Sequence, residues 1–153
     1  LNPLARTNVA PLTHPPKEAM LYGFSYIRPS EKAIRPTFII AGAGELLDGT
    51  LKIEGIVRRG ETHAQAMQEK AAYVMKVMEE RLLGLGGRWD LVNRVNIYTA
   101  HSLNGLVETI VLPKLGDAQH HGVHWYQARP PILDIEYEMD MRGVVQELYV
   151  HLL

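Results

Sequence analysis

The alternation of apolar and polar positions is clearest over residues 62–83, where it predicts one long helix. Apolar side chains recur there at spacings of three and four residues, which places them on a single helical stripe. The stripe consists of Ala64, Met67, Ala71, Val74, Met75, Met78 and Leu82. Thr62 and Gln65 form a capping-box pattern at its start. The helix is expected to end at a glycine-rich segment that contains Gly84, Gly86 and Gly87.

Shorter apolar runs and alternating segments predict strands on both sides of this helix. The expected strands cover residues 22–27, 37–41, 51–57, 91–99, 132–141 and 144–151. A short second helix is expected over residues 102–112, with Ser102 as its cap and Pro113 as its stop. This order indicates an α+β fold in which one long and one short helix pack on one face of a sheet.

The start of the chain differs from the rest in its proline content. Residues 1–20 show no periodicity and contain Pro3, Pro11, Pro15 and Pro16. We expect an N-terminal arm there, not a domain. Residues 21–153 show neither an internal repeat nor a linker, so we expect a single domain.

Acidic side chains alternate with apolar ones over residues 132–141. One face is expected to carry Leu133, Ile135, Tyr137, Met139 and Met141. The other is expected to carry Ile132, Asp134, Glu136, Glu138 and Asp140. The acids would spread over about 20 Å of strand, too far apart to bind one cation, so a solvated face is expected. Arg142 and Gly143 are expected to turn the chain.

Composition narrows the classes of function. The chain has no cysteine, which excludes disulfides, thiolate nucleophiles and cysteine-ligated metals. A net charge of −1 gives no field that would attract nucleic acid or an anionic membrane. No apolar run approaches the roughly 20 residues of a membrane helix. We therefore expect a cytoplasmic protein that binds neither nucleic acid nor membrane.

Five segments, in this order and spacing, resemble the RidA/YjgF family over residues 21–150. They are Phe38 to Gly42, the helix after Gly60-Glu61-Thr62, Asp90 to Tyr98, Ala128-Arg129-Pro130-Pro131, and Val144 to Val150. The resemblance implies a chorismate-mutase-like mixed sheet and a homotrimer with clefts between subunits. It also implies hydrolysis of enamines and imines to ketoacids and ammonia. Some relatives deaminate intermediates of aromatic ring degradation, and others are described as ribonucleases or translation inhibitors.

The chain departs from the family pattern near the expected site. Ala41 and Ala43 stand where the family has serine and glutamine, and Ala128 replaces the proline before the arginine. The preceding loop carries histidines and a tryptophan that the family pattern lacks. These departures indicate a divergent branch of the family.

Arg129 is the strongest candidate for substrate binding. A guanidinium offers a planar fork of donors that matches a carboxylate bidentately. Pro130 and Pro131 would stiffen the backbone that follows. The resemblance gives Arg129 the role of the carboxylate-binding arginine. The alternative is a surface arginine or an intersubunit salt bridge.

Glu147 is the candidate proton carrier. Alternation places it on one strand face with Val145 and Tyr149, and apolar neighbours would suit a carboxylate that exchanges protons with water. The alternative is a charge on a solvated strand. If the register against the family slips by one alternate position, Val145 takes the place of the acid.

Three further positions are candidate substrate contacts. The resemblance implies that Tyr22 and Gly42 form pocket walls. A tyrosine can stack on a planar substrate, and a glycine lets the backbone approach it closely. Glu45 follows the glycine turn and would add an acid near the same cleft. An ordinary core tyrosine and an ordinary turn glycine are the alternatives.

The loop ahead of Arg129 is rich in histidine and aromatic residues. His124 is a candidate proton relay, while His121 and Trp125 are candidate substrate contacts, with Tyr126 beside them. Three histidines, counting His120, can bind zinc, but their spacing matches no helical zinc motif, so we expect no metal. The alternative is a polar loop at a subunit interface.

Together these patterns predict a cofactor-free deaminase, hydrolase or lyase that releases ammonia from a small carboxylate. The aromatic loop favours an aromatic-derived enamine, imine or hydroxylamino acid. Arg129 would anchor the carboxylate and Glu147 would move protons. The alternatives are a non-catalytic sensor of small acids, a ribonuclease, and a structural subunit of a larger enzyme.

Overall fold

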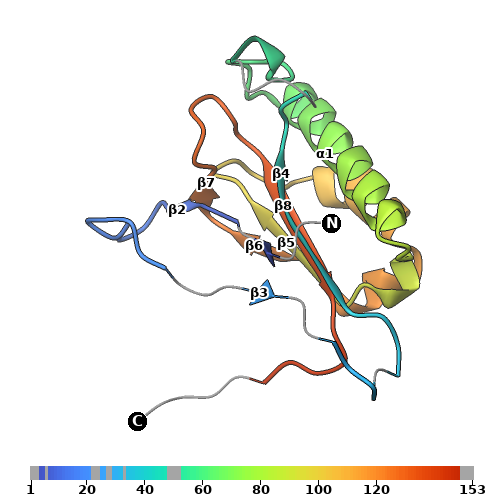
Figure 1. The fold of residues 1–153 in the computed structure, drawn as a ribbon. Helices are drawn as coiled ribbons and strands as arrows, with labels where there is room; N and C mark the ends of the chain where they lie inside the picture. Colours follow the sequence, from blue (N-terminus) through green and yellow to red (C-terminus); the bar gives the residue numbers. More distant parts are fainter. Residues whose placement is uncertain are drawn as a thin grey trace.

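The fold is built on one mixed sheet with a long helix across one face, as the ribbon of the computed structural model shows (Figure 1). Its strands are β4 (Phe38–Gly44), β8 (Glu138–Gly143), β5 (Arg94–Tyr98) and β6 (His124–Tyr126), in that spatial order. β8 lies antiparallel to β4 and to β5, whereas β6 runs parallel to β5. The structure describes residues 4–5, 7–21, 25–26, 29–32, 34–47 and 53–148.

The long helix α1 (Ala64–Gly84) confirms the helix expected from the apolar stripe. Its buried face packs on Met139 and Met141 of β8 and on neighbouring strands to form the core. Two details differ from the sequence prediction. The N-cap is His63, whose Nδ1 accepts from the Ala66 amide. Ala66 is buried in place of Ala64, because the helix starts later than the capping-box pattern indicated.

The second helical region is broken into short turns. It contains η3, a π-helical turn (Val107–Val111), then α2 (Leu112–Leu115), then the 3₁₀ helix η4 (Gly116–His121). The expected second helical segment is therefore present, but it starts at Leu106 instead of Ser102 and continues past Pro113 to Leu115. Pro113 lies in the first turn of α2, where its missing amide proton costs no helical hydrogen bond.

Three predicted strands differ from the observed structure because side chains and tight packing redirect the backbone. In place of the strand over residues 51–57, the described part contains a 3₁₀ turn, η1 (Ile53–Gly55). The strand at 132–141 begins only at Glu138, because the amides of Glu136 and Tyr137 donate to the Glu45 carboxylate, not to a neighbouring strand. Another 3₁₀ turn, η2 (Trp89–Leu91), precedes β5.

The expected turn and closing strand after β8 are also different. Arg142 and Gly143 belong to β8, where an added Cβ on Gly143 would lie 2.4 Å from a carbonyl oxygen of η2. Gly143 therefore permits a close approach and makes no turn. Residues 144–148 form no strand and are mostly exposed. The expected strand over residues 144–151 is wrong for this described part.

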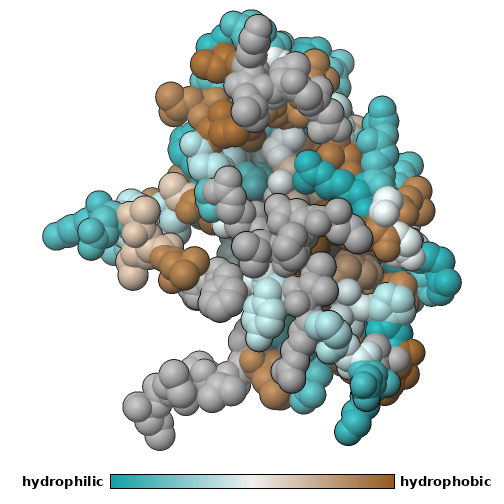
Figure 2. Space-filling view, in the orientation of Figure 1, coloured by the Kyte–Doolittle hydropathy of each residue, from teal (hydrophilic) through white to brown (hydrophobic). Residues whose placement is uncertain are grey.

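The N-terminal arm is tied to the domain by two short strand pairs. β1 (Leu4–Ala5) pairs with β3 (Ser25–Tyr26), and β2 (Ala10–Pro11) pairs with β7 (Ala128–Arg129). The loop after β2 projects from the body and carries both hydrophilic and hydrophobic side chains (Figure 2). Tyr22 lies outside the described residues.

The fold is thus a mixed α+β arrangement, as the order of elements indicated. The π turn and α2 continue the helical layer over the same core as α1. Within the described part of the chain, no helix is both long and apolar enough to cross a membrane.

Candidate active site

Arg129 lies beside an acid and a histidine that come from two other segments. Its Nη1 is 3.7 Å from Glu136 Oε2, and His101 Nε2 lies 2.8 Å from the same oxygen. The Arg129 side chain is 59% exposed and that of Glu136 only 17%. The arrangement therefore presents an open guanidinium fork above a partly buried carboxylate.

Backbone and hydroxyl hydrogen bonds fix this group. Thr99 Oγ1 donates to the Glu136 carbonyl at 2.6 Å and accepts from the His101 amide at 3.1 Å. Pairing of β7 with β2 holds Arg129 opposite Ala10. The acid and the histidine are thus positioned by one threonine at the end of β5, which favours a defined geometry over two free side chains.

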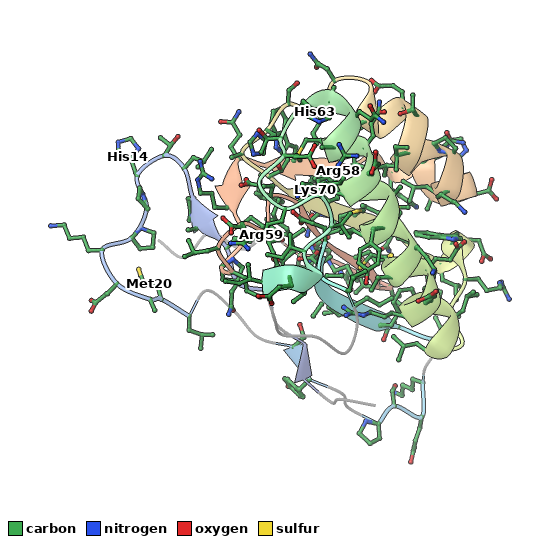
Figure 3. The ribbon with its side chains drawn as sticks, turned by 90° about the horizontal axis from the view of Figure 1, so that it is seen from above. His14, Met20, Arg58, Arg59, His63 and Lys70 are labelled. Carbon is green, nitrogen blue, oxygen red and sulfur yellow. The ribbon has the colours of Figure 1, made fainter. Side chains whose placement is uncertain are left out.

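Glu45 supports this group from within the core. It is fully buried, and its carboxylate accepts from the amides of Glu136 at 2.6 Å and Tyr137 at 3.0 Å. Lys70 Nζ, equally buried, donates to it at 3.1 Å and to the Val57 carbonyl at 2.8 Å. Lys70 projects from α1 into this region, whereas His14 and Met20 lie out on the arm (Figure 3). We therefore assign Glu45 to the support of Glu136 and leave it out of the proposed substrate contacts.

A β-bulge in β4 brings backbone close to another acid, Glu138. Between Ile40 and Ala43 the register with β8 shifts, and Gly42 lies in the bulge. A Cβ added to Gly42 would lie 1.9 Å from Glu138 Oε1, so a side chain at this position would displace the carboxyl from its present place. Bulges of this kind commonly occur next to active sites. The predicted role of Gly42 as a pocket wall stays a prediction, and here the glycine makes room for Glu138.

The predicted solvated acidic face is wrong for Glu138. The residue is only 8% exposed, and burial raises the pKa of its carboxyl to about 7, with further contributions from Asp140 and Glu45 and opposition from Arg81. Arg81 itself donates to the carbonyls of Ala41 and Gly42. A carboxyl in this setting carries a proton near neutral pH.

Asp140, the next acid on the same face, is by contrast surrounded by donors. It accepts from Asn96 Nδ2 and the Tyr98 hydroxyl, each at 2.7 Å, and from Thr7 Oγ1 at 3.1 Å. Thr7 Oγ1 also accepts from the Gly42 amide at 3.2 Å. Burial first, and then the Asp140 charge, raise the pKa of the Tyr98 hydroxyl. Asp140 thus fastens the arm to the sheet.

His124 and Glu147 lie together, but away from Arg129. Glu147 forms an ion pair with Arg142, which is the cross-strand partner of Arg94. Burial first, and then the charge of Arg94, lower the pKa of His124, while Glu147 raises it and Arg142 lowers it. Five residues of extended chain separate Arg94 from Thr99, about 16 Å. Within one chain, the structure therefore does not gather the predicted catalytic set.

The two remaining sequence candidates, Trp125 and His121, lie in different elements, in β6 and at the end of η4. Trp125 is 42% exposed, and its Nε1 donates to the Thr99 carbonyl at 3.1 Å, which places the indole near the residue that holds Glu136. His121 ends η4 and is exposed. Among the residues described, no three histidine or acidic side chains gather as metal ligands would. Substrate contact by either residue stays a prediction.

The family profile described as 2-aminomuconate deaminase CnbZ matches residues 1–148. The chain belongs to this family. A 2-amino-5-chloromuconate deaminase from Comamonas testosteroni is 36% identical over 149 residues, which cover 96% of this chain and 59% of that protein. The chain thus spans about three fifths of the length of this curated relative.

Solved structures share parts of the fold of this CnbZ-family chain. A Thermotoga maritima protein described as a candidate endoribonuclease matches with a TM-score of 0.54 and 17% identity, covering 94% of this chain and 97% of that one. A Yersinia pestis protein of the Rid family matches with a TM-score of 0.48 and 18% identity, over 71% and 78% of the two chains. The sequence prediction of a divergent RidA/YjgF branch is confirmed by the family match.

Sequence reasoning on this CnbZ-family chain missed Glu136, Glu138 and His101 as site residues. The acids were interpreted as a solvated face because alternation reports which residues share a face, but not what covers it. A glycine inside the apolar run at Gly42 was the available signal, because a missing side chain in a strand often marks a close approach.

The raised pKa of Glu138 predicts a pH-dependent stability. The folded protein keeps this proton up to about pH 7, whereas the unfolded chain releases it near 4.5, so stability falls as pH rises through this window. Glu138→Gln removes the effect. Its free energy of unfolding relative to wild type should rise by on the order of 3 kcal/mol between pH 4.5 and 8. Urea unfolding at both pH values measures this difference.

The exposed Glu108→Gln serves as the matched control, and it should show no such trend. A difference between Glu138→Gln and wild type that stays constant with pH would show that the carboxyl ionises normally in the folded state.

Proposed function

We propose that this chain is a deaminase that releases ammonia from an aminomuconate-type acid, a product of aromatic ring cleavage. The observation that carries the proposal is the group of Arg129, Glu136 and His101, with one carboxylate oxygen shared between two basic side chains. Membership of a family described by 2-aminomuconate deamination supports the substrate class.

The proposed reaction is a hydrolysis and needs no redox partner. A carbon of the enamine gains a proton while the nitrogen lone pair forms a C=N bond. Water then attacks the carbon of this iminium group and loses a proton. The C–N bond breaks, ammonia leaves, and a keto acid remains. The protein must therefore bind a carboxylate, activate water and supply protons.

Arg129 and Glu136 meet the first two of these needs. The exposed fork of Arg129 can take a substrate carboxylate bidentately, since its contact with Glu136 is long at 3.7 Å. Glu136, held by Thr99 and next to His101, is placed to accept a proton from water. We assign this role to Glu136 in place of Glu147, because Glu147 is bound to Arg142 in a separate part of the chain.

We also propose that the chain forms a homotrimer. The homotrimer implied by the RidA resemblance would bring a second copy to the exposed side of Arg129, where the single chain leaves the fork open. His124, Trp125 and Glu147 are exposed or half-buried and would be available to such a neighbour.

Ammonia release by Glu136→Gln tests the function. With 2-aminomuconate generated in place, wild type should release ammonia, and Glu136→Gln should lower kcat by about 10² to 10⁴, the usual contribution of a general base. The exposed Glu108→Gln is the matched control and should retain wild-type turnover. Saturable binding of the acid without ammonia release by wild type would instead identify a sensor of small acids.

A further inference from the structure

Glu138 is a buried acid without a donor. It is 8% exposed and lies against Gly42 of the β4 bulge, and none of the hydrogen bonds or ion pairs seen in the described part of the chain involves its carboxyl. Glu136 and Asp140, which flank it on the same face, each have donors or cations within contact distance. Burial without donors favours the protonated form of such a carboxyl.

The same carboxyl lies next to the proposed reaction site. Alternation directs Glu136 and Glu138 to the face opposite α1, because Tyr137 and Met139 between and after them are buried in the core. Residues two apart on an extended chain are about 6.6 Å apart. With this spacing, a planar substrate that is anchored at Arg129 and lies along β8 would reach both acids. The bulge at Gly42 leaves the room that the Glu138 carboxyl itself occupies, which fixes where this acid lies on the sheet.

We propose that Glu138 is the acid that protonates the carbon of the conjugated enamine during deamination. The O–H bond of Glu138 breaks, and a C–H bond forms from the electron pair of the enamine double bond. The nitrogen lone pair then makes the iminium group, and Glu138 is left as a carboxylate. Glu136 takes a proton from the water that adds to the iminium carbon and passes it to the nitrogen, so that the C–N bond breaks and ammonia leaves. Glu138 regains its proton from the hydroxyl group on the same carbon as the C=O bond forms. The inference rests on the proposed function, because it assigns a step of that reaction.

The division of labour follows from the surroundings of the two acids. Glu136 is already contacted by Arg129 and His101, so it is the acceptor of the pair. The charges of Asp140 on β8 and of Glu45, which directly follows β4, raise the pKa of Glu138, and Arg81 of α1 lowers it. Tyr98 on β5 is the cross-strand partner of Glu138. Two acids with opposite surroundings form a recognised acid and base arrangement.

The pH dependence of kcat tests the assignment. In wild type, kcat should fall as pH rises through about 7, because the protonated form of Glu138 is required. Glu138→Gln should lower kcat about a hundredfold and abolish this alkaline decline. Glu138→Asp should keep the decline at reduced kcat, and it also covers the case in which Glu138→Gln does not fold by circular dichroism.

The outcomes separate the two proposals. If wild type releases ammonia and Glu138→Gln keeps its kcat within twofold with the same alkaline decline, the assignment of Glu138 is overturned and the proposed function stands. If wild type releases no ammonia from 2-aminomuconate, both are overturned. If Glu138→Asp shows wild-type kcat without the decline, another group titrates and the assignment is again overturned.

Discussion

Arg129→Ala is expected to lower kcat/KM for ammonia release about a thousandfold, because two charge-assisted hydrogen bonds to a carboxylate are lost together. Most of the loss should appear in KM if Arg129 binds substrate and transition state equally, and in kcat if it orients the acid for protonation. The measurement is initial rates of ammonia release over a range of concentrations of 2-aminomuconate generated in place.

Arg129→Lys is the informative companion, because it keeps the charge but loses the planar fork. It should recover only part of the lost activity. Folding should be unaffected in both variants, since the side chain is 59% exposed and its contact with Glu136 is long. Wild-type rates in Arg129→Ala would remove Arg129 from the site and return it to the alternative of a surface arginine.

Lys70→Met is expected to destabilise the fold by about 3 to 5 kcal/mol, the usual effect of leaving a buried charge without its partner. Lys70 and Glu45 are both fully buried and 3.1 Å apart. Removing the ammonium leaves the carboxylate in the core, where it still accepts two backbone amides. Urea unfolding of both proteins measures the difference in free energy.

The same helix provides a matched control for Lys70. Lys76 is 71% exposed and lies 3.7 Å from Glu80, so Lys76→Met should cost less than about 1 kcal/mol. The double variant Lys70→Met with Glu45→Gln should recover part of the loss, because no buried charge remains. Equal destabilisation by the two lysine variants would show that the buried pair stabilises the fold no more than the exposed pair does.

Local pattern was enough to predict the frame of the fold. The spacing of apolar residues by three and four positions predicted α1 nearly to its ends, and the apolar run at residues 37–41 predicted most of β4. Local pattern failed where a distant side chain redirects the backbone. The amides of Glu136 and Tyr137 bond to Glu45, and no periodicity within residues 132–141 reports a partner so far away in the sequence.

Only part of the candidate site followed from the sequence. Arg129 was predicted from its chemistry and from the family resemblance, and the structure gives it an acidic neighbour. The choice of Glu147 depended on a register that assumed a closing strand after Gly143, whereas the acids lie in β8 and just before it. His101 was missed because it follows β5 without any motif and gains meaning only through its contact with Glu136.

The bulge in β4 brings position 42 into direct contact with the side chain at position 138, which is far away in the sequence. Gly42 has no side chain, and the space that it leaves is filled by the carboxyl of Glu138. A side chain introduced at position 42 would therefore push this carboxyl out of its place, and it would change the surroundings of the acid without touching position 138.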